Sequence, residues 1–133
     1  AKELLNLKIK RRESFRPFAP SILKEQVKDW FELDEPVPFM EKVFPIRKDK
    51  QAQIPAVTHA DGSGRLHTVD KEVSERYYKL IAAFYQQTQV PILLNTSFNE
   101  NEPIVNAPEE AIRCYLRTDM DMLVMQNIIL ERN

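Results

Sequence analysis

The chain contains only two glycine residues, Gly62 and Gly64, in 133 positions. A tight reversal of the backbone needs the positive φ that glycine adopts most readily, so we expect a hairpin-like turn at Asp61–Gly64. The chain has neither a Walker loop nor a dinucleotide-binding loop, because its two glycines are only two positions apart. If this chain binds a nucleotide, cationic side chains must therefore replace the backbone amides of a glycine-rich loop.

Apolar residues with a helical period alternate along the chain with short extended segments. We expect helices at residues 24–33, from Asp70 to about Thr88, and after Asn106-Ala-Pro-Glu, which resembles a capping box. The expected buried stripe of the last helix comprises Ile112, Tyr115 and Leu116. Extended segments or strands are expected at residues 18–23, 39–46, 56–59, 65–69, 91–94, 122–125 and 128–130. This alternation predicts an α/β (α+β) domain with two layers and a mixed sheet.

Two prolines restrict the first extended segment. Pro17 and Pro20 suit an edge strand or an extended stretch rather than a helix, because proline lacks a backbone N–H. Together with the hairpin-like turn, they argue against a purely parallel, doubly wound sheet.

The composition limits the possible partners. Nineteen Lys and Arg residues against twenty Asp and Glu give a net charge of −1, which argues against bulk attraction to nucleic acid or an anionic membrane. The single cysteine excludes an internal disulfide and a cysteine-based zinc site. No apolar run approaches the roughly 20 residues that a membrane helix needs. We expect one domain over residues 1–133, with no membrane partner and a cytoplasmic location.

Positive charge gathers near the start of the chain. Residues 1–16 hold six cations and two anions, a local charge of +4 in a chain with a total of −1. If this segment is extended, Lys10, Arg12 and Arg16 point to one side, where they could grip phosphate oxygens. A solvated basic face or a surface for an acidic partner is the alternative, and charge alone favours it.

Small polar residues follow the apolar run that ends at Leu94. On an extended backbone Asn95, Ser97 and Asn99 share one face, and Thr96 points into the packing on the other. Ligands favour the carboxyl ends of strands in α/β sheets, so these three side chains could hold a phosphate or a carboxylate-like group. A polar turn after a strand is the alternative.

Four further residues carry weaker signals. Arg65 and His67 lie on one side of the strand expected after the glycine turn, although an arginine there is usually a surface residue. His59 and His67 have no Asp, Glu or Cys at ligand spacing, which argues against a metal site. Cys114 lies in a helical stripe and is expected to pack in the core.

Three long blocks of the sequence resemble a known family. In chain order the blocks are Lys10–Leu23 (KRRESFRPFAPSIL), Pro55–Val69 (PAVTHADGSGRLHTV) and Pro91–Ala111 (PILLNTSFNENEPIVNAPEEA). They resemble the C-terminal domain of the NodU/CmcH/TobZ family of O-carbamoyltransferases, and the resemblance covers essentially the whole chain. One departure is that many relatives have a glycine soon after the Asn-Thr-Ser-Phe-Asn segment, where this chain continues with Glu100-Asn-Glu and Pro103.

The resemblance implies a YrdC-like fold and an activity that is shared with a second domain. In the complete enzyme such a domain forms carbamoyl adenylate from ATP and carbamoyl phosphate, with Mg²⁺ accompanying the nucleotide. A preceding N-terminal transferase domain, which holds the family's histidine-bound metal, then passes the carbamoyl group to an acceptor hydroxyl. The resemblance thus implies that this chain is a piece that lacks the N-terminal domain and binds no metal of its own.

The resemblance also suggests roles for particular residues. By position, Lys10, Arg16 and Arg65 are the catalytic candidates that would contact phosphate or carbamoyl oxygens. Ser97 and Asn99 match the family's Ser-x-Asn element and would contact the nucleotide phosphates. Further nucleotide-binding candidates on the same faces are Arg12, Asn95, Thr96 and His67.

Two alternatives remain open at this point. The chain could be a non-catalytic nucleotide- or RNA-binding module, since the basic segment would also suit RNA phosphates. The net negative charge and the lack of RNA-recognition aromatic motifs argue against RNA. The isolated piece could also fold without activity, if its site is completed by the N-terminal domain.

Overall fold

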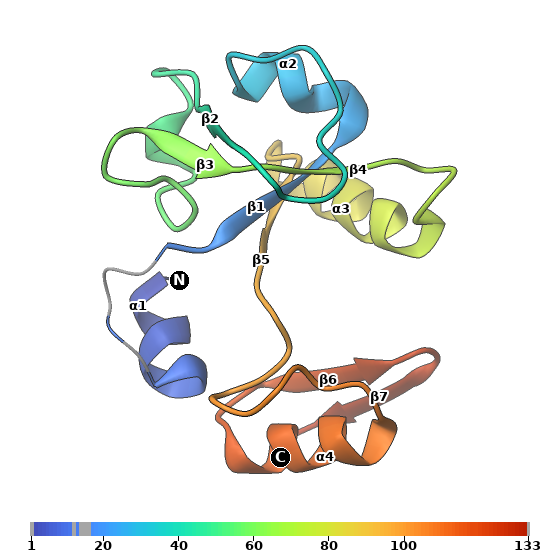
Figure 1. Ribbon diagram of the computed structural model, residues 1–133. Coiled ribbons are helices and arrows are strands. Elements are labelled where there is room, and N and C mark those ends of the chain that lie inside the picture. The colour runs from blue at the N-terminus through green and yellow to red at the C-terminus, as the bar shows by residue number, and fades with distance from the viewer. Residues whose placement is uncertain (1, 12, 14–16, 133) are drawn as a thin grey trace. The chain divides into compact units, whose positions relative to one another are not determined.

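The structure is a computed structural model that describes residues 2–11, 13 and 17–132. The chain divides into two compact units (Figure 1). The central unit comprises residues 17–96, and the terminal unit combines residues 1–16 with residues 97–133. Each unit is described by itself below.

A three-stranded mixed sheet organises the central unit. Strand β1 (Ala19–Leu23) lies in the middle, parallel to β4 (His67–Val69) and antiparallel to β5 (Ile92–Asn95). The prediction of a mixed sheet is confirmed, but the edge position expected for β1 is wrong. The pairing of β1 with β4 begins only at Ser21, so Pro20 pairs with β5 alone and its missing N–H is tolerated in a central strand.

Helix α3 (Glu75–Thr88) covers this sheet, contacting both β1 and β5. All five residues of β1 are buried, and Leu23, Val69 and Ile81 form a core where the sheet meets α3. Partly buried residues packed against this core are Tyr77, Tyr78, Ala82, Tyr85 and Leu93. A sheet with helices packed against it confirms the predicted two-layer α/β organisation.

The start of α3 differs from the prediction. The helix begins at Glu75 rather than near Asp70, although its end at Thr88 is as expected. The Asp70 carboxylate accepts a hydrogen bond from the Glu72 N–H at 2.9 Å and pairs with Lys24 at 2.5 Å, so Asp70 stabilises a turn that precedes the helix. Val73 lies in this turn and is 83% exposed, because it precedes the buried face of the helix.

The glycine turn is present, but its strands pair differently. Gly62 has a φ of +82°, and the backbone reverses through a His59 N–H bond to the Ser63 carbonyl at 2.8 Å. Strand β3 (Ser63–Arg65) pairs antiparallel with β2 (Val43–Pro45) instead of with residues 56–59, which form turns rather than a strand. The prediction of a turn is therefore confirmed, but the prediction that residues 56–59 supply the pairing strand is wrong.

The predicted helix at residues 24–33 is shorter than expected. A 3₁₀ turn (Lys24–Gln26) leads into α2 (Val27–Trp30), and a second 3₁₀ turn lies at Gln51–Gln53. Helix α2 ends because Phe31 adopts an extended conformation and forms a β-bridge with Ile46. Both residues are almost completely buried, so packing determines where the helix ends.

Where it is described, the terminal unit consists of helices, a π-helical turn and a hairpin. Its elements are α1 (Lys2–Leu5), a π-helical turn (Asn6–Lys10), α4 (Pro108–Arg117), β6 (Met122–Met125) and β7 (Ile128–Glu131). Strands β6 and β7 pair antiparallel, so the two apolar runs form two strands, and α4 lies along the hairpin (Figure 1).

The stripe that helix α4 buries agrees with the predicted one only at Tyr115. Ala111, Cys114 and Tyr115 are buried, whereas Ile112 and Leu116 are exposed. Ala111 and Tyr115 form a core with Leu123 of β6. The helix cap is also shifted: Ala107 is the N-cap without a side-chain bond, and the Glu110 carboxylate accepts the Asn106 N–H at 3.0 Å. Among the described residues, no helix is long and apolar enough to cross a membrane.

The backbone at Gly62 provides a test of the turn. A Cβ atom there would lie 2.6 Å from Nε2 of Gln51, and a φ of +82° is unfavourable for a residue with a side chain. We expect Gly62→Ala to lower the free energy of unfolding by about 1–3 kcal/mol, as measured by chemical denaturation. Ala60→Ser, at an exposed position of the same turn, is the control. Equal stability of Gly62→Ala and the wild type would contradict this account.

Candidate functional site

A buried lysine forms the centre of the candidate site in the terminal unit. Lys10 ends the π-helical turn and is only 3% exposed. Its ammonium donates hydrogen bonds to the carbonyl oxygens of Ser97 and Asn99 at 2.5 and 2.7 Å. It also lies 2.9 Å from Oδ1 of Asn99 and 3.3 Å from Oγ of Ser97. Burial of an ammonium group is tolerated where oxygen atoms take over the role of water in this way.

Ser97 and Asn99 also contact one another. The Ser97 hydroxyl donates to Oδ1 of Asn99 at 2.6 Å, and the Asn99 side-chain amide donates to the Glu102 carbonyl at 2.7 Å. The Asn99 N–H donates to the Ser97 carbonyl at 3.1 Å, so the two residues meet across a turn. Ser97 and Asn99 are therefore in contact, but the extended backbone on which Asn95, Ser97 and Asn99 were expected to share a face ends at Asn95.

Ion pairs of neighbouring residues lie next to this cluster. Arg11 pairs with Glu100 at 3.2 Å and donates to the carbonyl of Arg117 at 3.2 Å. Arg117 in turn pairs with Glu102 at 2.6 Å. Hydrogen bonds from backbone N–H groups, first its own and then those of Glu100 and Asn101, lower the pKa of the Glu102 carboxyl to about 2. The sequence analysis missed Glu102 and Arg117, although the Glu100-Asn-Glu departure lies at this position.

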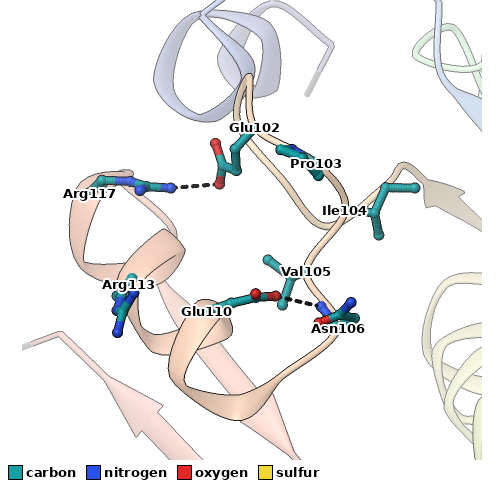
Figure 2. A pocket seen from close by; sticks show the side chains of 8 residues that line it. All are labelled: Glu102, Pro103, Ile104, Val105, Asn106, Glu110, Arg113 and Arg117. Atoms are coloured by element: carbon teal, nitrogen blue, oxygen red, sulfur yellow. Dashed lines mark hydrogen bonds and ion pairs between the residues drawn. The ribbon is translucent and has the colours of Figure 1, made fainter.

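A cleft of about 230 Å³ lies between the loop that follows Asn99 and helix α4 (Figure 2). Its lining residues are Glu102, Pro103, Ile104, Val105, Asn106, Glu110, Arg113 and Arg117. Figure 2 shows the Arg117 guanidinium reaching across to Glu102 at one end of the loop, and Glu110 reaching Asn106 at the other. These two contacts tie the loop to the helix.

A second polar cluster lies in the central unit and includes two predicted residues. The Ser21 hydroxyl, which is fully buried in β1, lies 2.9 Å from Nδ1 of His67 in β4. The side-chain amide of Asn95 in β5 lies 3.4 Å from the same nitrogen. The His67 ring stacks on Tyr77 with 6.3 Å between centroids. Burial lowers the pKa of His67, which favours the neutral form of the ring.

The other predictions for site residues concern strands, packing and backbone conformation. Arg65 is exposed in β3 and pairs with Val43, whereas His67 belongs to β4, so the shared strand expected for Arg65 and His67 is wrong. Thr96 is exposed rather than packed. Lys10 is helical rather than extended. Arg12 and Arg16 lie outside the described residues.

Two other expectations concern metal ligands and the cysteine. Within residues 2–11, 13 and 17–132, no three His, Cys, Asp or Glu side chains gather in a way that could hold a metal ion. Cys114 is buried in the inner face of α4, and burial raises the pKa of its thiol, as suits a packing residue.

Comparisons with known proteins give a consistent result. The family described as "Carbamoyltransferase C-terminus" matches residues 1–132 of the chain. An uncharacterized protein of Synechocystis is 47% identical over 97% of the chain. The nodulation proteins NolNO of Sinorhizobium fredii and NolO of Bradyrhizobium diazoefficiens are each 44% identical over 98% of it. The chain spans 24%, 20% and 25% of the lengths of these three relatives.

The contacts of Lys10 predict a large effect on stability. Lys10→Met would remove the donor from Oδ1 of Asn99 and from two backbone carbonyls, so we expect a loss of about 1–3 kcal/mol in the free energy of unfolding. Lys28→Met is the matched control, because Lys28 forms an exposed pair with Asp34 at 3.4 Å and its replacement should change stability by less than about 1 kcal/mol. Similar losses in the two variants, measured by urea denaturation, would argue against a structural role for Lys10.

The lowered pKa of His67 predicts that the stability of the protein depends on pH. Its pKa is lowered in the folded state from 6.5, so the unfolded state binds a proton more readily once the pH falls below about 6.5. Stability should then decline as the pH drops from 7.5 to 5.5, and His67→Gln should flatten part of this decline. The free energy of unfolding, measured at both pH values for the two proteins, checks this. Parallel pH dependences in wild type and variant would show that His67 makes no contribution.

Proposed function

Because this chain belongs to the carbamoyltransferase C-terminus family, we propose that it forms carbamoyl adenylate from ATP and carbamoyl phosphate within a longer O-carbamoyltransferase. In this reaction water first cleaves carbamoyl phosphate to carbamate and inorganic phosphate. A carbamate oxygen then attacks the α-phosphorus of ATP, and pyrophosphate leaves. On an N-terminal transferase domain, the hydroxyl of an acceptor would then take the carbamoyl group, and AMP would be released. A dependence on ATP and carbamoyl phosphate is consistent with a cytoplasmic enzyme.

The contact of Lys10 with Ser97 and Asn99 carries the proposal. It places an ammonium group, a hydroxyl group and a side-chain amide within one cluster, although the residues are 87 and 89 positions apart in sequence. Both substrates are polyanions, and catalysis of phosphoryl transfer depends mainly on positioning and on neutralising charge. A cluster of this kind supplies both without a glycine-rich loop.

The burial of Lys10 limits how a ligand can use it. Its ammonium is engaged with oxygen atoms of the Ser97–Asn99 turn, whereas the Ser97 side chain is exposed. Phosphate oxygens would therefore meet Ser97 and Asn99 first, and would compete with the turn for the ammonium of Lys10. The positive charge beneath the turn favours an anion in either arrangement.

The proposal also assigns substrate contacts to the other candidate residues. Arg16 and Arg65 would neutralise phosphate or carbamoyl oxygens, because guanidinium groups bind such oxygens in pairs. The further nucleotide contacts proposed are those of Arg12, Asn95, Thr96 and His67. Mg²⁺ would arrive with the nucleotide and neutralise its phosphates, and the donors of the Lys10 cluster suit the phosphates rather than the metal.

Calorimetry with Mg-ATP tests the proposal. We expect Arg16→Ala and Ser97→Ala each to weaken ATP binding by about tenfold or more, because each removes a contact to a charged ligand. Arg76→Ala is the matched control, since Arg76 is exposed on α3 and should leave the affinity unchanged. Unchanged affinity in both site variants would rule out the assigned pocket.

A second measurement separates adenylation from simple binding. Pyrophosphate release that depends on carbamoyl phosphate would support the proposed reaction, in this chain or in the protein that carries the transferase domain. Binding of single-stranded RNA that falls steeply with salt, with no binding of ATP, would instead favour an RNA-binding module.

A further inference from the structure

We propose that Arg117 and Glu102 are positioning residues that hold the Ser97–Asn99 turn against Lys10. The inference rests on the proposed function, because it explains how the proposed ATP-binding groups keep their geometry. Neither Arg117 nor Glu102 is assigned a contact with the substrate.

The first step is the orientation of Asn99. Its side-chain NH₂ donates to the Glu102 carbonyl at 2.7 Å, so its Oδ1 is directed to the ammonium of Lys10 and the hydroxyl of Ser97. An asparagine amide that loses this acceptor is free to turn and to present NH₂ to the ammonium, which would repel it. The position of the Glu102 backbone therefore decides which atom of Asn99 faces Lys10.

The second step is what holds Glu102 in place. One carboxylate oxygen of Glu102 accepts the Arg117 guanidinium at 2.6 Å, and the other accepts the Asn101 N–H at 3.1 Å. Arg117 lies in the last turn of α4, a helix whose other face is buried with Tyr115 and Leu123. The ion pair thus connects a loop that carries the candidate site to a helix fixed by the core.

Arg117 also contacts the N-terminal segment that carries Lys10. Its backbone carbonyl accepts a hydrogen bond from Arg11, the residue next to Lys10, at 3.2 Å. Arg11 pairs in turn with Glu100, within the same loop as Glu102. One residue at the end of α4 is therefore bound to both segments that meet at the site: the N-terminal segment through its carbonyl and the loop through its guanidinium.

The exposure of the pair indicates a positioning role rather than a stabilising one. The side chains of Arg117 and Glu102 are 52% and 31% exposed, and ion pairs of this kind contribute little to global stability. Removing the guanidinium should therefore loosen the loop while the terminal unit stays folded. Affinity for the ligand and the environment of Asn99 are the properties that should change.

The experiment compares two arginines of one helix. Arg117→Met removes the ion pair, and Arg113→Met is the control, because Arg113 lines the same cleft one turn earlier and has no hydrogen bond or ion pair within the described part of the chain. Arg117→Lys tests rescue by a charged side chain. The readouts are the NMR signals of the Asn99 side-chain amide, Mg-ATP affinity by calorimetry, and the thermal unfolding midpoint.

We expect Arg117→Met to shift the Asn99 amide signals and to weaken Mg-ATP binding by about 10- to 100-fold, with little change in the unfolding midpoint. Arg117→Lys should recover part of the affinity, and Arg113→Met should match the wild type. Identical amide signals in Arg117→Met and Arg113→Met would overturn the proposal. If the wild type binds no Mg-ATP, the proposed function fails, but the Asn99 signals still decide whether Arg117 positions the turn.

Discussion

Placing a lysine ammonium inside a small unit is costly unless oxygen atoms surround it, and this requirement organises the terminal unit. Lys10 is 3% exposed and is surrounded by backbone and side-chain oxygens of Ser97 and Asn99. The turn that supplies these oxygens has to be tight, and its next residues have to be tied to α4. The same contacts therefore form the candidate site and hold the terminal unit together.

The polar cluster of the central unit differs from that of the terminal unit, because it lies within a sheet rather than at a turn. Ser21 and His67 face each other on the parallel strands β1 and β4, and Asn95 joins them from β5. A neutral imidazole is the form that such a site holds most easily, since burial disfavours the charged ring. Both units thus place polar groups where strands or turns from distant parts of the sequence meet.

The sequence predicted those features that depend on local chemistry. The reversal at Gly62, the end of the long helix at Thr88 and the strand that ends at Asn95 all follow from residue type and spacing. Pairing partners were not predictable in this way. That β1 is central and that β3 pairs with β2 depend on which buried surfaces fit together. Lys10 and Ser97 were both candidates, but only the fold shows that they touch.

The terminal unit is built from two segments that lie on either side of the central unit in sequence. The donor at Lys10 and its acceptors at Asn99 are separated by 89 positions, and the whole central unit lies between them. The N-terminal segment is synthesised well before α4, β6 and β7. During that time Lys10 has no contact with the oxygen atoms of Ser97 and Asn99, because these residues have not yet been made. The central unit, whose contacts are complete by Thr96, can fold in that interval. The candidate site therefore cannot form before the whole central unit has been synthesised.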